Sequence, residues 1–141
     1  MIDPKITPEF LNKNYNSNMV SALGIEYTEV GNDYICGKMP VNENTRQPIG
    51  ILHGGASVVL AETLGSVASN FMVDLTKVYC VGLEINANHV RSIKDGVVYG
   101  KANAVHIGKK THIWDIRITN EAKQLICISR LTVAVLERKD I

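Results

Sequence analysis

The chain has 141 residues, of which 15 are Lys or Arg and 14 are Asp or Glu, for a formal net charge of +1. This length suits one hydrophobic core, so we expect residues 1–141 to form a single domain. An apolar fraction of 45% with so little net charge excludes a globally disordered chain. The charge gives no overall attraction to nucleic acid or to an anionic membrane, so we expect neither among the partners.

The cysteines and the first residues bear on the compartment. Cys36, Cys80 and Cys127 are widely spaced and form no C-x-x-C pair, which indicates reduced, buried thiols rather than a zinc knuckle or a disulfide framework. The first residues lack the basic start and apolar run of a secretory signal peptide. These features predict a cytoplasmic protein.

The chain begins with signals for one short helix and two strands. Thr7 is a good N-cap and Pro8 a good first helical residue, so residues 7–16 predict a short amphipathic helix. Residues 25–40 predict two strands joined by a turn at residues 31–33, where Gly, Asn and Asp supply turn chemistry.

The segment 54–73 is the most unusual part of the sequence. It is rich in Ala, Val and Leu and carries one formal charge, Glu62. Its length would suit a membrane span, but its Ser, Thr and Asn side chains and the glutamate argue against lipid. We therefore predict a helix that is buried nearly all round in a soluble core.

After this helix the apolar residues alternate with a period of two. Four strands are predicted, separated by short turns, at residues 78–90, 96–107, 111–119 and 124–137. Short connections require antiparallel pairing. The predicted fold is therefore α+β, with an antiparallel sheet wrapped around one long central helix.

Glu62 is the first candidate for chemistry. A carboxylate on a buried helix costs several kcal/mol if it is fully desolvated and unpaired, so its presence needs a reason. Ser66 lies one helical turn later on the same face. The pair either forms part of a dry site with a base or nucleophile, or is structural, and the spacing alone supports both interpretations equally.

The run His53-Gly54-Gly55 stands just before the long helix. The first N–H groups of a helix have no partner within it, and the helix dipole is positive there. Two glycines allow a substrate to approach the backbone, so this turn suits polarisation of a carbonyl oxygen. Gln47 adds an uncharged donor on the same loop.

Two small cationic clusters suit phosphate binding. The run 89–92 (HVRS) ends one predicted strand, and the run 106–111 (HIGKKT) occupies a turn between two others. His112 and Trp114 share a strand face, which favours a place in the core. The histidines lack metal-ligand spacing, so no metal site is predicted.

The run 50–69 (GILHGGASVVLAETLGSVAS), followed by 81–92 (VGLEINANHVRS), resembles the hotdog-fold acyl-CoA thioesterases. The similarity covers about residues 7–137. It is greatest to the branch with the phenylacetate-pathway, 4-hydroxybenzoyl-CoA and 1,4-dihydroxy-2-naphthoyl-CoA thioesterases. The resemblance implies a hotdog fold, acyl-CoA thioester hydrolysis, and no metal or organic cofactor.

The resemblance also implies roles for single residues. Glu62 matches the nucleophile or general base that acts on the thioester. Gly55 matches the glycine whose backbone N–H polarises the thioester carbonyl, while Gln47 and His53 match side chains that line this site. Ser66 matches a hydroxyl that holds water or the acyl group.

Substrate binding is implied for a larger set of positions. Thr63 matches a hydroxyl position on the same helix, and the acyl pocket is expected around Val67, Asn70 and Phe71. The residues that match the coenzyme A groove are Gly82, His89, Arg91, Ser92, His106, Gly108, Lys109, Lys110 and Thr111. In such enzymes the glutamate of one subunit faces the loop of another, so the resemblance implies a dimer as the minimum active unit and a homotetramer of two dimers.

The run 81–92 favours 1,4-dihydroxy-2-naphthoyl-CoA, an intermediate of menaquinone biosynthesis, as the substrate. One alternative is a proofreading thioesterase that acts on aryl-CoA or hydroxyacyl-CoA, or on acyl groups held by a carrier protein. Others are a module that senses acyl-CoA without turnover and a hotdog dehydratase. A sensor has no need of a buried carboxylate, and the His-Gly-Gly order before Glu62 fits hydrolysis better than dehydration.

Overall fold

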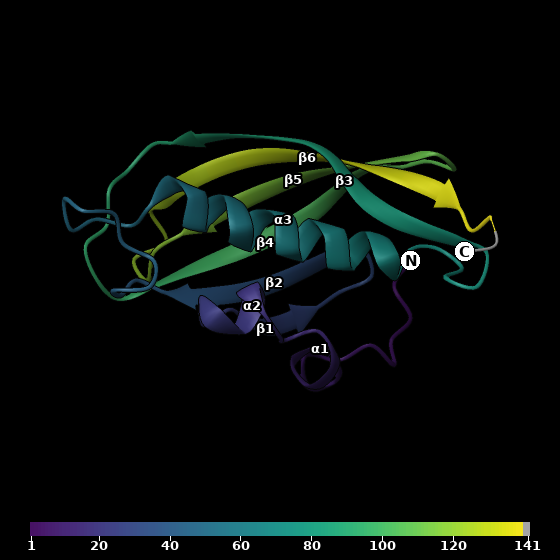
Figure 1. The fold of residues 1–141 in the computed structure, drawn as a ribbon, viewed down its shortest axis with the longest axis horizontal. Coiled ribbons are helices and arrows are strands. Elements are labelled where there is room, and N and C mark those ends of the chain that lie inside the picture. Colours follow the sequence, from purple (N-terminus) through teal and green to yellow (C-terminus); the bar gives the residue numbers. More distant parts are fainter. Residues whose placement is uncertain (140–141) are drawn as a thin grey trace.

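The computed structural model describes residues 1–139, which form one six-stranded sheet curved around a long helix (Figure 1). The elements in chain order are α1 (Pro8–Asn14), α2 (Met19–Ala22), β1 (Glu26–Val30), β2 (Tyr34–Pro40), α3 (Gly54–Asn70), β3 (Val78–His89), β4 (Val97–Ile107), β5 (Thr111–Thr119) and β6 (Leu125–Glu137). The strand order is β1-β2-β4-β5-β6-β3, and all neighbours are antiparallel. The predicted α+β architecture is confirmed.

The first helix begins where the sequence predicts. The Thr7 hydroxyl accepts a hydrogen bond from the Phe10 N–H at 3.2 Å, and Pro8 opens the helix. The four-residue helix α2 was not predicted. Its N-cap, Asn18, has a φ of 55° and makes no side-chain cap, so the hydrogen bond that usually stabilises a helix start is missing.

The long helix α3 lies against the concave face of the sheet (Figure 1). Gly65 lets it pack closely, because a Cβ at this position would come within 2.6 Å of Leu131 Cδ2. The prediction that this helix is buried nearly all round is wrong for one face, because the sheet covers only the opposite side. The half-exposed residues on the uncovered face are Val58, Val59, Glu62, Thr63 and Ser66.

The two edges of the sheet differ. Along β1, the Asn12 side chain donates to the Tyr27 carbonyl at 2.8 Å and accepts from the Tyr27 N–H at 2.8 Å, while Asn16 donates to the Ile25 carbonyl at 2.9 Å. These asparagines occupy backbone groups that a further strand would use. At the other edge, β3 has β6 as its one strand neighbour within residues 1–139. Its middle is exposed, and the Leu83 side chain is 67% accessible.

His112 and Trp114 face the core, as predicted, and both contact the end of α3. The Trp114 indole N–H donates to the Ser69 hydroxyl at 2.7 Å, and His112 Nδ1 lies 3.1 Å from the same oxygen. Since the indole can only donate, the Ser69 oxygen accepts from it, and the hydroxyl proton is free to donate to Nδ1 of the tautomer that carries its proton on Nε2. Burial lowers the pKa of His112 from 6.5, against a smaller opposing effect of the Gly108 backbone.

We expect stability to fall as the pH drops below about 6.5, because the unfolded chain then binds a proton that folded His112 resists. Urea unfolding between pH 5 and 8 measures this slope. In His112→Gln the slope over this range should flatten, whatever the absolute stability of the variant. Equal slopes for both proteins would assign the acid sensitivity to other groups.

No helix within residues 1–139 has both the length and the apolar character that a membrane crossing requires.

Candidate functional site

Four of the predicted site residues meet at the N-terminal end of α3. Gln47 from the loop before the helix and His89, Arg91 and Ser92 from the end of β3 line one cavity of about 280 Å³, together with Gly54. The His89 ring lies directly over Gly54, where an added Cβ would come within 2.7 Å of its Nε2. The structure thus places one predicted phosphate cluster beside the predicted carbonyl-polarising turn.

Backbone hydrogen bonds hold the loop that carries Gln47. The Gln47 N–H donates to the Ile51 carbonyl at 2.8 Å, and the His53 N–H donates to the Thr45 carbonyl at 2.8 Å. Gly50, with a φ of 85°, closes the turn between Gln47 and Ile51 in a conformation that favours glycine. The loop therefore presents Gln47 and His53 from a fixed frame.

His53 is the N-cap of α3 and uses the Gly55 N–H. Its Nδ1 accepts a hydrogen bond from that N–H at 2.8 Å, which requires the neutral imidazole with its proton on Nε2. The Gly55 N–H, which the resemblance assigns to a thioester carbonyl, is therefore occupied by His53 in this arrangement. A carbonyl oxygen that binds there must displace His53 Nδ1.

Glu62 lies in the middle of α3 and its side chain reaches β3. There it contacts Gly82, and a Cβ on that glycine would collide with Glu62 Oε1. Gly82 therefore makes room for the carboxylate, rather than lying with the His89–Ser92 cluster as the coenzyme A assignment implied. A shift in strand register between Gly82 and Glu84 leaves Leu83 without a partner on β6, and such bulges are frequent next to active sites.

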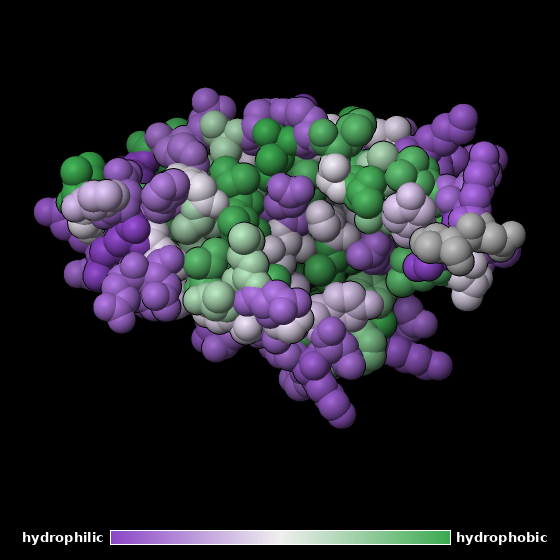
Figure 2. Space-filling model, viewed as in Figure 1, coloured by the Kyte–Doolittle hydropathy of each residue, from purple (hydrophilic) through white to green (hydrophobic). Residues whose placement is uncertain are grey.

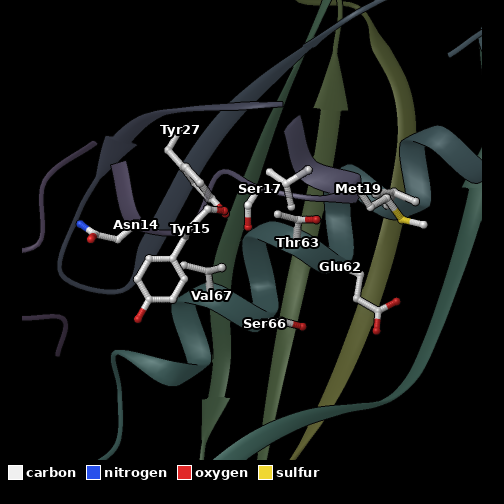
Figure 3. Close-up of a pocket in the computed structure, with 11 residues that line it drawn as sticks. Asn14, Tyr15, Ser17, Met19, Tyr27, Glu62, Thr63, Ser66 and Val67 are labelled. Carbon is white, nitrogen blue, oxygen red and sulfur yellow. The ribbon is translucent and has the colours of Figure 1, made fainter. Parts of the chain in front are cut away.

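The Glu62 carboxylate borders the largest described cavity near α3, which measures about 470 Å³ (Figure 3). Its lining residues are Asn14, Tyr15, Ser17, Met19, Val20, Tyr27, Val59, Glu62, Thr63, Ser66 and Val67. Thr63, Ser66 and Val67 were expected near the substrate, and the helix brings them together with Glu62. Phe71, expected in the acyl pocket, instead packs on Phe10 and Tyr15 outside this cavity.

Two groups of predicted catalytic residues stay apart within one chain. Gly55 and Glu62 are seven residues apart on α3, which is about 10 Å along the helix axis. Glu62 lines a cavity of about 470 Å³, whereas Gly55 lines neither that cavity nor the one of about 280 Å³. A reacting carbonyl has to lie about 3 Å from both the attacking group and the oxyanion donors. One chain alone does not assemble this set.

The second phosphate cluster lies at the other end of the sheet. The loop after His89 and the β4–β5 hairpin are separated by β4 (Figure 1). The 11 residues of β4 span roughly 35 Å at ~3.4 Å per residue. Gly108 and Lys109 line a cavity of about 410 Å³ there, with Lys77 and His112. The remaining predicted residues of this hairpin are His106, Lys110 and Thr111. The His106 ring lies over Gly108. One chain therefore does not form the predicted coenzyme A groove from both clusters.

Comparison with known proteins identifies the family. The thioesterase superfamily model matches residues 49–127, which include the end of the loop before α3, α3 itself and most of the strands that follow. The chain belongs to the thioesterase superfamily. The predicted hotdog fold and the predicted class, thioester hydrolase, are thereby confirmed.

Individual relatives of this thioesterase cover nearly all of its length. The 1,4-dihydroxy-2-naphthoyl-CoA hydrolase of Escherichia coli is 48% identical over 94% of this chain and 96% of its own length. A Vibrio cholerae protein named as an esterase, VC_A0580, is 55% identical over 92% of this chain and 86% of its own. Among solved structures, a mutant of thioesterase PA1618 from Pseudomonas aeruginosa has a TM-score of 0.93 and 44% identity, and covers 96% of this chain and 98% of its own.

The N-terminal wall of the 470 Å³ cavity was missed by sequence reasoning. It comes from Tyr15, Met19 and Tyr27, which lie at least 35 residues before Glu62 in the chain. A signal was present in residues 17–24 (SNMVSALG), where two cap-type residues precede apolar residues and a final glycine. No metal site accompanies the cavity, since within residues 1–139 no three His, Cys, Asp or Glu side chains cluster as metal ligands would.

We expect Gly82→Ala to lower kcat of this thioesterase by roughly 10- to 100-fold with little loss of stability, since misplacing a reacting group by ~1 Å can cost about 10²-fold. The added methyl meets the free end of the Glu62 side chain, so the carboxylate moves and the backbone stays. Steady-state kinetics and thermal melts separate the two effects. Gly100→Ala is the matched control: its Cβ would come within 2.8 Å of Leu64 Cδ1 in the core, so stability should fall instead.

Proposed function

We propose that residues 1–141 act as one hotdog thioesterase domain that hydrolyses an aromatic acyl-CoA, with 1,4-dihydroxy-2-naphthoyl-CoA as the specific substrate. The observation that carries this proposal is the position of Glu62, a half-buried carboxylate at the border of a cavity fit for an acyl group. The similarity to the Escherichia coli hydrolase named for this substrate supports the choice of acyl group.

The lining of the cavity supports an uncharged acyl group. Among the described residues that line it, Glu62 is the only charged one. The cavity therefore offers no cation that would pair with a carboxylate on the acyl group. Tyr15 and Tyr27 supply aromatic surface, and the Ser17 and Thr63 hydroxyls lie between them and Glu62 (Figure 3). An aromatic ring with hydroxyl substituents matches this mixture of apolar walls and hydroxyl groups.

The reaction needs an attacking oxygen and donors for the charge that develops on the carbonyl oxygen. Glu62 either adds directly to the thioester carbon or deprotonates a water that adds in its place. The tetrahedral intermediate collapses with cleavage of the C–S bond, and the coenzyme A thiolate leaves and takes up a proton. Direct attack leaves the acyl group on Glu62 as a mixed anhydride, which water then hydrolyses. We assign the carbonyl oxygen to the Gly55 N–H, after displacement of His53 Nδ1, and the Gln47 amide to the orientation of the thioester.

We further propose that a second copy of the chain completes the site. Glu62 lies about 10 Å from Gly55 in its own chain, so another copy has to supply the loop with Gln47, His53 and Gly55. The free β3 edge is where such a copy can add, because the β1 edge is occupied by Asn12 and Asn16. Apolar side chains are visible on the face over α3 and β3 (Figure 2), as expected of a surface that a partner covers.

The same dimer brings together clusters that one chain keeps apart. The His89–Ser92 cluster and the hairpin 106–111 lie at opposite ends of the sheet, so antiparallel pairing of two β3 strands places the hairpin of one copy nearer the cluster of the other. We propose that coenzyme A binds across this interface. The resemblance implies a tetramer of two such dimers, which the mass of the wild-type particle tests.

A second candidate is a proofreading thioesterase with broad acyl specificity. A protein of Cronobacter turicensis named proofreading thioesterase EntH is 43% identical over 93% of this chain and 95% of its own length. The cavity beside Glu62 is open toward solvent at Met19, which favours tolerance of several acyl groups. Such an enzyme would act on aryl or hydroxyacyl groups carried by coenzyme A or by a carrier protein.

Thiol release from a small panel of acyl-CoA esters tests the proposal. The panel holds the 1,4-dihydroxy-2-naphthoyl, benzoyl, phenylacetyl, 3-hydroxyacyl and long-chain esters, with wild type and Glu62→Ala. A sharp preference for the naphthoyl ester that is lost in the variant supports the specific hydrolase. Broad activity that is lost in the variant supports the proofreading enzyme. Binding without turnover by wild type would overturn both and indicate a sensor.

A further inference from the structure

The segment 14–20, between α1 and β1, forms one wall of the cavity beside Glu62. Asn14, Tyr15, Ser17, Met19 and Val20 all line this cavity, opposite the face of α3 (Figure 3). The segment lies outside residues 49–127, which match the superfamily. Its contribution to the cavity is therefore a property of this part of the chain and not of the catalytic motif.

One end of this wall is held firmly. The Tyr15 ring packs at 5.4 Å from the Phe71 ring and at 6.2 Å from the Phe10 ring, both centroid to centroid. The buried Tyr27 hydroxyl donates to the Tyr15 carbonyl at 3.2 Å. Burial, with a smaller repulsion from Tyr15, raises the pKa of Tyr27 to about 12, so this donor keeps its proton at neutral pH. Tyr15 and Tyr27 are thus a fixed side of the cavity.

The other end of the wall has an unusual backbone conformation and an exposed side chain. Asn18 has a φ of 55° and a ψ of −125°, a conformation that residues with a Cβ rarely adopt. It is followed by Met19, whose side chain is 62% exposed although it is large and apolar. Met19 lies on the Glu62 side of the cavity, away from the two tyrosines (Figure 3). An unbranched thioether at such a place adapts its shape to what it contacts.

We propose that Met19 is a specificity-determining residue, which closes the cavity over the acyl group and sets the largest acyl group that reaches Glu62. This inference rests on the proposed function, since it assigns the cavity to the acyl group of the thioester. A flat ring packs on the fixed tyrosine side, and Met19 covers its opposite edge. The side chain at position 19 then discriminates between one ring and two.

Substitutions that change only the size of this side chain test the proposal. With Met19→Ala, kcat/KM for the dihydroxynaphthoyl ester relative to the benzoyl ester should change by about 10-fold, the effect of one or two methylene-sized contacts in a pocket. Met19→Trp should lower this ratio by a similar factor, because the indole fills the space of the second ring. Met19→Leu, which conserves volume, and Val105→Ala, an exposed apolar position on β4, should leave the ratio within 2-fold of wild type.

Two further measurements separate this inference from the proposed function. The inhibition constant of free coenzyme A should be the same for wild type and for all Met19 variants, because coenzyme A without its acyl group does not reach the cavity. If wild type hydrolyses no ester, the proposed function fails. Calorimetric Kd values for the same two esters then still test whether Met19 discriminates between the two acyl groups. A ratio of kcat/KM, or of Kd in that case, that stays within 2-fold in both Met19→Ala and Met19→Trp overturns the proposal. Met19 is exposed, so melting temperatures near that of wild type should accompany every variant.

Discussion

Glu62→Gln is expected to lower kcat for acyl-CoA hydrolysis by about 10³-fold, because a positioned general base contributes roughly 10²–10⁴ and a nucleophile at least as much. The amide keeps the shape of the side chain and its contact with Gly82, so the fold and the cavity stay intact. The Kd of the acyl-CoA esters should therefore change little. Single-turnover kinetics and calorimetry on the same preparation measure the two effects.

Glu84→Gln is the matched control. Glu84 is an exposed glutamate on the same strand as Gly82, two residues further along, and its carboxylate accepts hydrogen bonds from the Asn86 amide. Glu84→Gln removes the same charge from the same region without changing the lining of the cavity. If Glu62→Gln retains more than a tenth of wild-type kcat, Glu62 does not supply the attacking oxygen or its base.

Mixing two inactive variants locates the rest of the site. One variant lacks Glu62 (Glu62→Ala), and the other lacks the loop donors (Gln47→Ala with His53→Ala). If Glu62 of one copy acts with the loop of another, a two-fold dimer has two composite sites. About half of all random dimers are mixed and each mixed dimer has one intact site, so about a quarter of all sites are intact. Thiol release should then return to about a quarter of the wild-type rate. No recovery on mixing would place both groups in one chain.

The sheet and the long helix follow from the sequence because their signals are local. Pro40 ends β2, the glycine and asparagine of the 31–33 turn separate β1 from β2, and period-two alternation marks the four later strands. The helix α2 is different, because four residues show no periodicity. Contacts with α3 help to hold it in place, and these are tertiary interactions that a local pattern does not contain.

The candidate site shows the same division. Glu62 stands out because it is the one charge on an apolar helix, and His53 because an N-terminal N–H needs a partner. In the structure the Gly55 N–H donates to His53 Nδ1, so His53 is itself the partner. A side chain at the N-cap that accepts such an N–H stabilises the helix start. The separation of the two phosphate clusters also follows from the order of the strands along the chain, since the connections before and after β4 lie at opposite ends of that strand. The cavity wall at Tyr15 does not follow from the sequence, because tertiary contacts with Phe71 and Tyr27 place this residue.

The edge of β3 carries the last prediction. Val81→Lys with Leu83→Lys should convert the particle to a monomer and reduce thioester hydrolysis by at least 100-fold while the chain stays folded. Lysine on an edge strand opposes pairing with another strand, and both native side chains are exposed in the single chain, so the core loses little. Sedimentation measures the mass, and circular dichroism measures the fold.

Activity should fall with the dimer because the monomer keeps Glu62 about 10 Å from the Gly55 N–H of its own chain. Val105→Lys is the control, since Val105 is 55% exposed on β4, an interior strand whose edges are already paired. It adds a charge to an apolar surface position and should leave both mass and activity near wild type. A monomeric double variant with full activity would show that one chain builds the whole site, and Glu62 would then need a different oxyanion donor from its own chain.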